Sequence, residues 1–353
     1  MTMKSPFTLT RRSLLAGATA ALATPAILRP AYAQTTLTLA DPGGPFNSAF
    51  RKAFYDPFEK ETGIKIVNVA REAEPTAQFK SIVETQSYIW DLSTLTLSAR
   101  KILSESGLLE PTGITKEQVP DIMPEAVFDD FLGITIYCHI FATRTDLLKD
   151  NIPQSWTDYW NVEKFPGRRS LRKNPIDTLE QALLADGVPL AELYPLDVDR
   201  AFASLDKIKD HISVWWTGGA QSTQLLQSGE VSMISGWNAR LQSAIDGNVP
   251  AEIHWDQGLY SIEGWAIPKG NPRADQAREF IKFCSRAEQQ ALFTEELAYG
   301  PTNKKAYDFI PAERAKILPT APQNISKMRL ADEDWWSANR AEMTERFNSW
   351  LLF

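Results

Sequence analysis

TLTLADPGGPFNSAFRKAFYDPFEKETGIKIVNVA is the sequence of residues 36–70. It gives the clearest indication of the fold class. Residues 36–40 alternate between polar and apolar, as in a half-buried strand, and the following PGG is typical of a turn. Phenylalanines then recur at every fourth position from Phe46 to Phe58, which places them on one face of a helix. Gly63 ends that helix before IKIVNVA. This strand–helix–strand unit predicts a parallel sheet covered by helices.

The same alternation continues to about Thr143, where the composition changes. The segment NIPQSWTDYWNVEKFPGRRSL, residues 151–171, is rich in Trp, Pro and Gly and begins a second α/β region that runs to about Gly258. The chain then returns to a strand, LYSIEGWAIP, followed by a turn and an amphipathic helix. A chain of this length exceeds what one hydrophobic core usually organises. We therefore expect an α/β fold of two doubly wound lobes with a ligand cleft between them.

The first 33 residues are typical of an export signal. They combine paired arginines at positions 11 and 12, an apolar stretch over 14–28, and small residues at Ala31 and Ala33. This pattern predicts a twin-arginine-like signal peptide cleaved after Ala33 and a periplasmic mature protein. A retained N-terminal anchor is the alternative interpretation.

The charge of the mature chain disfavours polyanionic partners. Cleavage removes four basic residues and leaves 33 basic against 44 acidic residues, a net charge of −11. Because no basic stripe is present, nucleic acid and anionic membranes are poor candidates, and a cationic or zwitterionic small solute is favoured.

The sequence holds no recognisable catalytic or metal-binding motif. Its three histidines lack metal-ligand spacing, and nucleophile-elbow, phosphate-loop and dinucleotide-binding motifs are absent. We expect no enzyme, no cofactor and no metal. Cys138 and Cys284 are interpreted as two buried thiols, with a disulfide between them as the alternative.

Three residues attract attention as binding candidates. Trp237 follows the apolar strand VSMISG and stands near its carboxyl end. Glu263 lies inside an apolar strand, where a carboxylate is either ligand-facing or a solvated edge residue. Asp177 stands three residues before Glu180, which is capping-box spacing, so its first interpretation is a helix N-cap that could also face the cleft.

Several longer motifs carry a resemblance to a known family. They are FYDPFEKETGIKIV, DLSTLTLS, SWTDYWNVEKFPGR, LLQSGEVSMISGWNAR, GWAIPKGNPRADQAREFIKF and YGPTNKKA. Over residues 36–310 the chain resembles the spermidine/putrescine-binding family of periplasmic solute-binding proteins of ABC importers. The resemblance implies a type II binding-protein fold and a monomer that docks on a membrane permease with its ATPase. It also implies one lobe of residues 34–141 plus 262–301, and another of 142–261 plus 302–353.

The resemblance further implies a set of ligand-binding positions. Trp237 matches an aromatic residue that sandwiches the ligand chain, and Glu263 matches an ammonium-binding carboxylate. Asp177 matches a carboxylate of the other lobe, while Thr96 and Ser98 match a ligand-contacting loop after a strand of the first lobe.

Three departures from the family pattern change the expected ligand. Asn174 replaces an aspartate, Ser261 replaces a tryptophan, and Arg240 replaces a small residue. A diamine gains nothing from an added arginine, whereas a zwitterion with separated charges needs one acid and one base.

We therefore predict an ω-amino acid such as 4-aminobutyrate, or a related amino-acid derivative. Glu263 would bind its ammonium, Arg240 its carboxylate, and Trp237 the carbon chain between them. Alternatively, Arg240 faces solvent or pairs with Asp246. The other candidate functions are polyamine binding, ferric iron binding, and a secreted enzyme on this fold.

Overall fold

The computed structural model describes residues 35–71 and 75–352. The strands are β1 (Thr36–Asp41), β2 (Lys65–Ala70), β3 (Leu92–Thr96), β4 (Leu109–Glu110), β5 (Val127–Phe128), β6 (Phe131–Arg144), β7 (Arg169–Arg172), β8 (Ile212–Trp216), β9 (Met233–Trp237), β10 (Ala251–Pro268), β11 (Gly300–Pro301) and β12 (Met328–Leu330).

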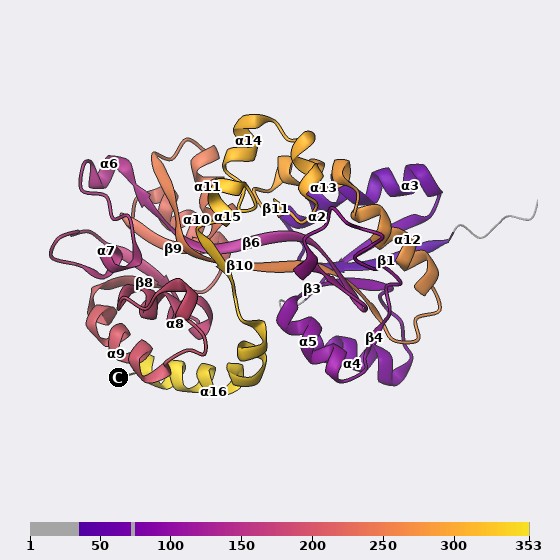
Figure 1. Cartoon of the computed structure of the whole chain (residues 1–353), viewed down its shortest axis with the longest axis horizontal. Coiled ribbons are helices and arrows are strands. Elements are labelled where there is room, and N and C mark those ends of the chain that lie inside the picture. Colours follow the sequence, from indigo (N-terminus) through magenta and orange to yellow (C-terminus); the bar gives the residue numbers. More distant parts are fainter. Residues whose placement is uncertain (1–34, 72–74, 353) are drawn as a thin grey trace, which may run out of the picture. The chain divides into compact units, whose positions relative to one another are not determined.

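The helices lie between these strands, except for the last, which follows β12 (Figure 1). They are α2 (Pro45–Phe50), α3 (Asp56–Thr62), α4 (Thr76–Thr85), α5 (Leu97–Glu105), α6 (Thr145–Leu148), α7 (Trp156–Trp160), α8 (Pro175–Ala185), α9 (Val198–Ile208), α10 (Gly219–Ser228), α11 (Asn238–Asp246), α12 (Ala274–Cys284), α13 (Ala287–Glu296), α14 (Ala312–Lys316), α15 (Pro322–Ile325) and α16 (Glu333–Leu352). A π-helical turn, Arg51–Tyr55, joins α2 to α3.

The sheet combines parallel and antiparallel strands in the order β2-β1-β3-β10-β6-β9-β7-β8. The outer strands pair in parallel, β1 with β2 and β3 at one end, and β7 with β8 and β9 at the other. The two long central strands β6 and β10 are antiparallel and run side by side (Figure 1). The predicted parallel strand–helix–strand unit of residues 36–70 is therefore confirmed, and the α/β fold with it.

The phenylalanine face of residues 46–58 is also confirmed, with one difference. Phe50, Phe54 and Phe58 are fully buried, but the π-helical turn between α2 and α3 shifts the helical phase. Tyr55 is consequently buried as well, and its hydroxyl donates to the Asp41 carboxylate at 2.8 Å. A buried phenol needs such an acceptor, because an unpaired polar group inside the core is costly.

The buried apolar side chains form separate clusters on either side of the middle of β6 and β10. One cluster takes its residues from 37–136 and 262–318, with Ala239. Two further clusters take theirs from 138–259 and 328–347. The buried side chains pass from the first cluster to the other two between Ile136 and Cys138 in β6, and between Leu259 and Ile262 in β10. Cys138 and Cys284 are both buried free thiols, as interpreted from the sequence.

A bulge in β10 sits close to the point where these clusters meet. The pairing with β6 shifts register between Glu263 and Gly264. A Cβ atom on Gly264 would lie 2.1 Å from the Leu132 carbonyl oxygen, so only glycine fits this approach of the two backbones. Bulges re-aim the neighbouring side chain, and here that side chain is Glu263.

Candidate functional site

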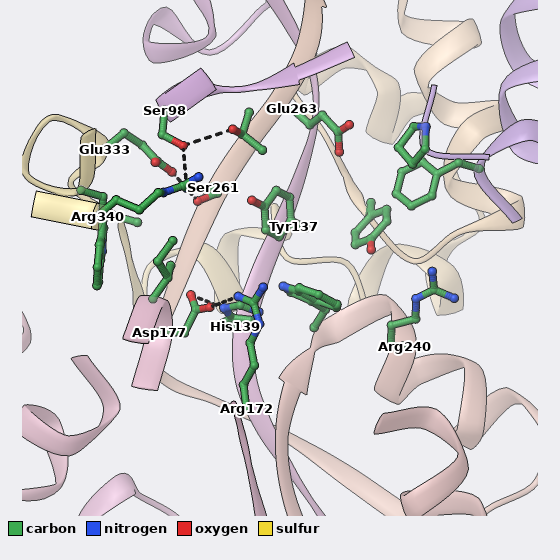
Figure 2. Close-up of a pocket in the computed structure, with 18 of the residues that line it drawn as sticks. Ser98, Tyr137, His139, Arg172, Asp177, Arg240, Ser261, Glu263, Glu333 and Arg340 are labelled. Carbon is green, nitrogen blue, oxygen red and sulfur yellow. Dashed lines mark hydrogen bonds and ion pairs between the residues drawn. The ribbon is translucent and has the colours of Figure 1, made fainter. Parts of the chain in front are cut away.

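A cavity of about 250 Å³ lies among the ends of β3 and β9, the middle of β6 and β10, and the first turns of several helices. All six binding residues predicted from the sequence line it, and Figure 2 labels four of them, Ser98, Asp177, Arg240 and Glu263. The six are Thr96, Ser98, Asp177, Trp237, Arg240 and Glu263. Because these residues come from segments far apart in the chain, the fold alone brings them to one place.

Glu263 is not a solvated edge residue. It is 6% exposed, and β10 lies between β3 and β6 within the sheet. Its carboxylate lies 2.6 Å from Nη2 of Arg71, a residue that directly follows β2 and also lines the cavity. The same guanidinium donates to the Thr94 hydroxyl at 2.9 Å. The edge interpretation is therefore wrong, because a buried carboxylate is retained here by an ion pair.

Asp177 is not the N-cap of α8. Asn174 is, and its side-chain oxygen accepts from the backbone N–H of Ile176 at 2.9 Å. The backbone leaves helical geometry at Asp177, where φ is 73°. The carboxylate of Asp177 instead accepts from His139 and from Arg172, at 2.8 Å for Arg172. The capping-box prediction fails because these two partners hold a buried carboxylate more strongly than one backbone N–H.

The partner of the supposed capping box has a different role. Glu180 is buried, and its Oε1 accepts from the Tyr194 hydroxyl at 2.7 Å and the Trp336 indole at 2.5 Å. Burial, with the nearby charge of Asp177, raises the pKa of Glu180 to about 8. Glu180 therefore lies behind the cavity wall as a largely neutral acid at neutral pH.

His139, Arg172 and Trp237 form one wall of the cavity. The His139 and Trp237 rings stack with centroids 5.2 Å apart, and the Arg172 guanidinium lies 4.7 Å from the Trp237 ring centroid. Burial lowers the pKa of His139, against the pull of the Asp177 carboxylate, and Arg172 lowers it further. Burial opposes ionisation of Asp177, but His139 and Arg172 outweigh it and lower its pKa. At neutral pH Asp177 is thus ionised and His139 neutral.

Arg240 stands in the first turn of α11 and lines the cavity. Its side chain passes Gly219, where an added Cβ would lie 2.8 Å from Arg240 Nε and 3.1 Å from the Trp237 indole. The alternative pairing with Asp246 does not occur, since that carboxylate contacts Gln242 at 2.8 Å and Arg314 at 3.3 Å. Within residues 35–71 and 75–352, the Arg240 guanidinium has no hydrogen-bond or ion-pair partner.

Thr96 and Ser98 are not in a loop. Thr96 ends β3 and caps α5, its hydroxyl accepting from the Ala99 N–H at 3.2 Å. Strand β3 passes directly into α5, and Ser98 lies in the first turn of that helix. Ser98 Oγ accepts from Arg340 at 3.1 Å (Figure 2). The two hydroxyls nevertheless line the cavity, as the resemblance implied.

The C-terminal helix α16 supplies residues that the sequence analysis missed. Glu333, Trp336 and Arg340 all line the cavity, and Glu333 accepts from the Ser261 hydroxyl at 2.8 Å. Further lining residues that were not predicted are Phe46 in α2 and, in strands or at their ends, Arg71, Tyr137, His139, Arg172 and Tyr299. No local motif marks any of them; Arg71 and Arg172 share only their position at the carboxyl end of a strand, where ligands bind in α/β folds.

The charges of the cavity wall do not balance. Four arginines line it, at positions 71, 172, 240 and 340, against the carboxylates of Asp177, Glu263 and Glu333. With His139 neutral, the lining residues that the structure describes carry one surplus positive charge. The surplus suits a solute that brings a negative group.

These features define a solute-binding cavity, and the sequence matches bacterial extracellular solute-binding proteins over residues 53–320. The chain belongs to that family of solute-binding proteins. It is 36% identical over 321 residues to the gamma-aminobutyric acid-binding protein of Pseudomonas aeruginosa, a match that covers 89% of this chain and 90% of that protein.

Solved structures show the same fold. An ABC transporter substrate-binding protein from Bradyrhizobium japonicum is 35% identical with a TM-score of 0.83, covering 90% of this chain and 99% of that one. A GABA receptor is 32% identical with a TM-score of 0.82, covering 90% and 98%. By sequence alone, a spermidine/putrescine-binding periplasmic protein of Haemophilus influenzae is a more distant relative, 22% identical over 280 residues, 75% of this chain and 77% of that protein. The predicted family and fold are confirmed.

The predicted signal peptide and its cleavage site lie outside the residues that the structure describes. From residue 35 to 71 and from 75 to 352, none of the helices combines the length and the apolar composition that a membrane crossing needs.

Proposed function

We propose that this protein is the periplasmic receptor of an ABC importer and that it captures a zwitterionic ω-amino acid, such as 4-aminobutyrate, in the cavity. Two similar proteins support the ligand class, the gamma-aminobutyric acid-binding protein and the GABA receptor. The observation that carries the proposal is the Arg240 guanidinium, which lines the cavity beside Trp237 without a partner among the described residues.

The charge pattern favours a carboxylate on the solute. Glu263 pairs with Arg71, and Asp177 pairs with Arg172. A guanidinium binds a carboxylate through two parallel N–H donors, and a cavity wall strengthens that attraction by excluding water. Arg240 therefore serves as the site for the carboxylate of the solute.

A diamine fits this charge pattern less well. It would bring two ammonium groups to a wall with a surplus positive charge, and Arg240 would repel the nearer one. Polyamine binding is the second candidate, because three carboxylates line the cavity and a spermidine/putrescine-binding protein is a distant relative.

The rest of the solute would contact residues already predicted. The Trp237 indole offers an apolar surface for the carbon chain. Glu263, whose carboxylate pairs with Arg71, is the acceptor predicted from the sequence for the ammonium group. A cavity of about 250 Å³ suits an amino-acid-sized solute, because the pockets that hold drug-sized ligands are typically larger, roughly 300–1,000 Å³.

The remaining features of the receptor are proposed on the same basis. A twin-arginine-like signal would be cleaved after Ala33, and the mature monomer would deliver its solute unchanged to a permease and its ATPase.

The lobes would meet at the middle of β6 and β10, where the buried apolar side chains pass from one cluster to the others. Because Ala306, Ile310 and Leu318 pack in the first cluster, we place the last lobe boundary near residue 320 rather than 302.

The test is calorimetric titration of ligand-stripped protein with 4-aminobutyrate and, in parallel, putrescine. We expect tight binding of the amino acid and a loss of about tenfold to a hundredfold in affinity on Arg240→Ala. Arg168→Ala is the control, because the Arg168 side chain is 59% exposed and its guanidinium pairs only with Glu230, at 3.3 Å, among the described residues. Tight binding of putrescine that is indifferent to Arg240→Ala would overturn the proposal in favour of a polyamine receptor.

A further inference from the structure

The imidazole of His139 has one ring nitrogen with a partner and one without. The residue is 5% exposed, lies in the middle of β6 and lines the cavity (Figure 2). Nδ1 contacts the Asp177 carboxylate. Nε2 is buried and has no hydrogen-bond partner among the described residues. A buried polar atom without a partner is rare in proteins, and at a ligand cavity it indicates a position that a ligand fills.

The contact with Asp177 fixes which nitrogen carries the proton. Arg172 lies 2.8 Å from the other oxygen of the same carboxylate and holds it ionised, so Asp177 can only accept hydrogen bonds. Nδ1 must therefore donate. Because burial lowers the pKa of His139, the ring is neutral, and Nε2 presents a lone pair. Nε2 is therefore a hydrogen-bond acceptor that can bind a donor group of a ligand.

Trp237 connects this acceptor to the proposed carboxylate site. Its indole stacks on the His139 ring at 5.2 Å between centroids. The same indole and Arg240 Nε both lie within about 3 Å of the position that a Gly219 Cβ would occupy. His139, Trp237 and Arg240 are thus consecutive along one wall, in the order acceptor, apolar surface and cation.

Resting on the proposed function, we infer that His139 Nε2 accepts a hydrogen bond from the N–H group of the bound ω-amino acid. The carbon chain would then lie along Trp237, with the carboxylate at Arg240. Asp177 acts as the positioning residue, because it selects the tautomer that leaves the lone pair on Nε2.

This assignment differs from the one based on Glu263. The Glu263 carboxylate is occupied by Arg71 at 2.6 Å, whereas Nε2 of His139 has no partner among the described residues. The two residues also stand four positions apart on paired strands, since Glu263 pairs with Thr135 and Leu259 with His139. Substitutions at the two residues therefore distinguish the two assignments.

Access to Nε2 requires a small movement. The atom itself has no contact with solvent, and the half-buried Trp237 indole is the neighbour that stacks on its ring. A shift of that indole on binding would admit the donor.

The experiment compares two substitutions at His139 by calorimetric titration with 4-aminobutyrate. His139→Asn retains an amide near Nδ1 for Asp177 but removes the acceptor at the Nε2 position, and we expect at least about tenfold weaker binding. His139→Gln places a carbonyl oxygen near the Nε2 position and should recover part of the loss. Glu263→Gln is the matched comparison: a large loss there, with His139→Asn binding like wild type, would overturn the inference and leave the proposed function intact.

A measurement on the wild-type protein tests the inference even if a variant fails to fold. In ¹⁵N-resolved spectra we expect Nδ1 of His139 to be protonated and Nε2 to be unprotonated, with the Nε2 resonance shifting when 4-aminobutyrate is added. His211 and His254 serve as internal controls. A proton on Nε2, or no shift at saturation, would overturn the inference. Absence of 4-aminobutyrate binding to the wild-type protein would instead overturn the proposed function on which the inference rests.

Discussion

Arg71 Nη2 and Glu263 Oε1 lie 2.6 Å apart, although 192 positions separate the two residues in the sequence. Their side chains are 3% and 8% exposed, so both charges are almost fully withdrawn from water. A buried pair of this kind contributes little net stability, yet removing one partner leaves an uncompensated charge. The pair therefore fixes the geometry of the cavity wall more than it strengthens the fold.

Arg71→Met should destabilise the protein by about 3–5 kcal/mol, because it leaves Glu263 buried without its cation. The double variant Arg71→Met/Glu263→Gln should regain most of that loss, since the buried charge is then gone. Urea unfolding of the three proteins measures both effects. A double variant no more stable than Arg71→Met would show that the ion pair is not the cause.

Gly219→Ala should weaken binding of 4-aminobutyrate roughly fivefold, about 1 kcal/mol, with little change in stability. The new methyl group would lie 2.8 Å from Arg240 Nε and 3.1 Å from the Trp237 indole, so the flexible guanidinium must move aside. The adjacent Gly218→Ala is a matched control, because a Cβ there has no atom within 4 Å. Equal affinities for the two variants would contradict the placement of Arg240 in the site.

Glu180→Gln should remove a pH dependence of stability. The pKa of Glu180 is about 8 in the folded protein, against 4.5 ordinarily, so the unfolded chain releases this proton first as pH rises. The stabilising contribution is fully present below pH 4.5 and is lost as pH rises through 8, by on the order of 4 kcal/mol. Unfolding free energies at pH 5, 6.5 and 8 should fall more steeply for wild type than for Glu180→Gln.

The exposed Glu192 provides the control for that series. Glu192→Gln should follow the wild-type pH profile. If Glu180→Gln also follows it, the buried neutral carboxyl is not the source of the pH dependence.

Several residues that line the cavity could be predicted from single positions in the sequence. Trp237 ends strand β9 and lines the cavity, as its position after a buried apolar strand predicted. Arg240 stood out as a departure from the family pattern, and it lines the cavity. Asp177 was found for partly the wrong reason: the capping-box spacing is real, but its carboxylate contacts His139 and Arg172 instead of the helix backbone.

The residues that pair with them could not be predicted from single positions. Arg71, His139 and Arg172 carry no local motif, and their roles arise only because β2, β6 and β7 end or pass beside the cavity. The residues of α16 are separated in sequence from their partners by even more positions. The hydrogen bond from Arg340 to Ser98, for example, spans 242 positions.

The sequence by itself determined the order of strands and helices, the buried phenylalanine face and the family, because these depend on short-range periodicity and contiguous motifs. Only the tertiary structure decided which charges are neutralised, which nitrogen of His139 is left as an acceptor, and that Arg240 rather than Glu263 keeps an unpaired charge among the described residues. The physical reason is that electrostatic and hydrogen-bond energies depend on distance and burial in space, and neither quantity is a function of separation along the chain.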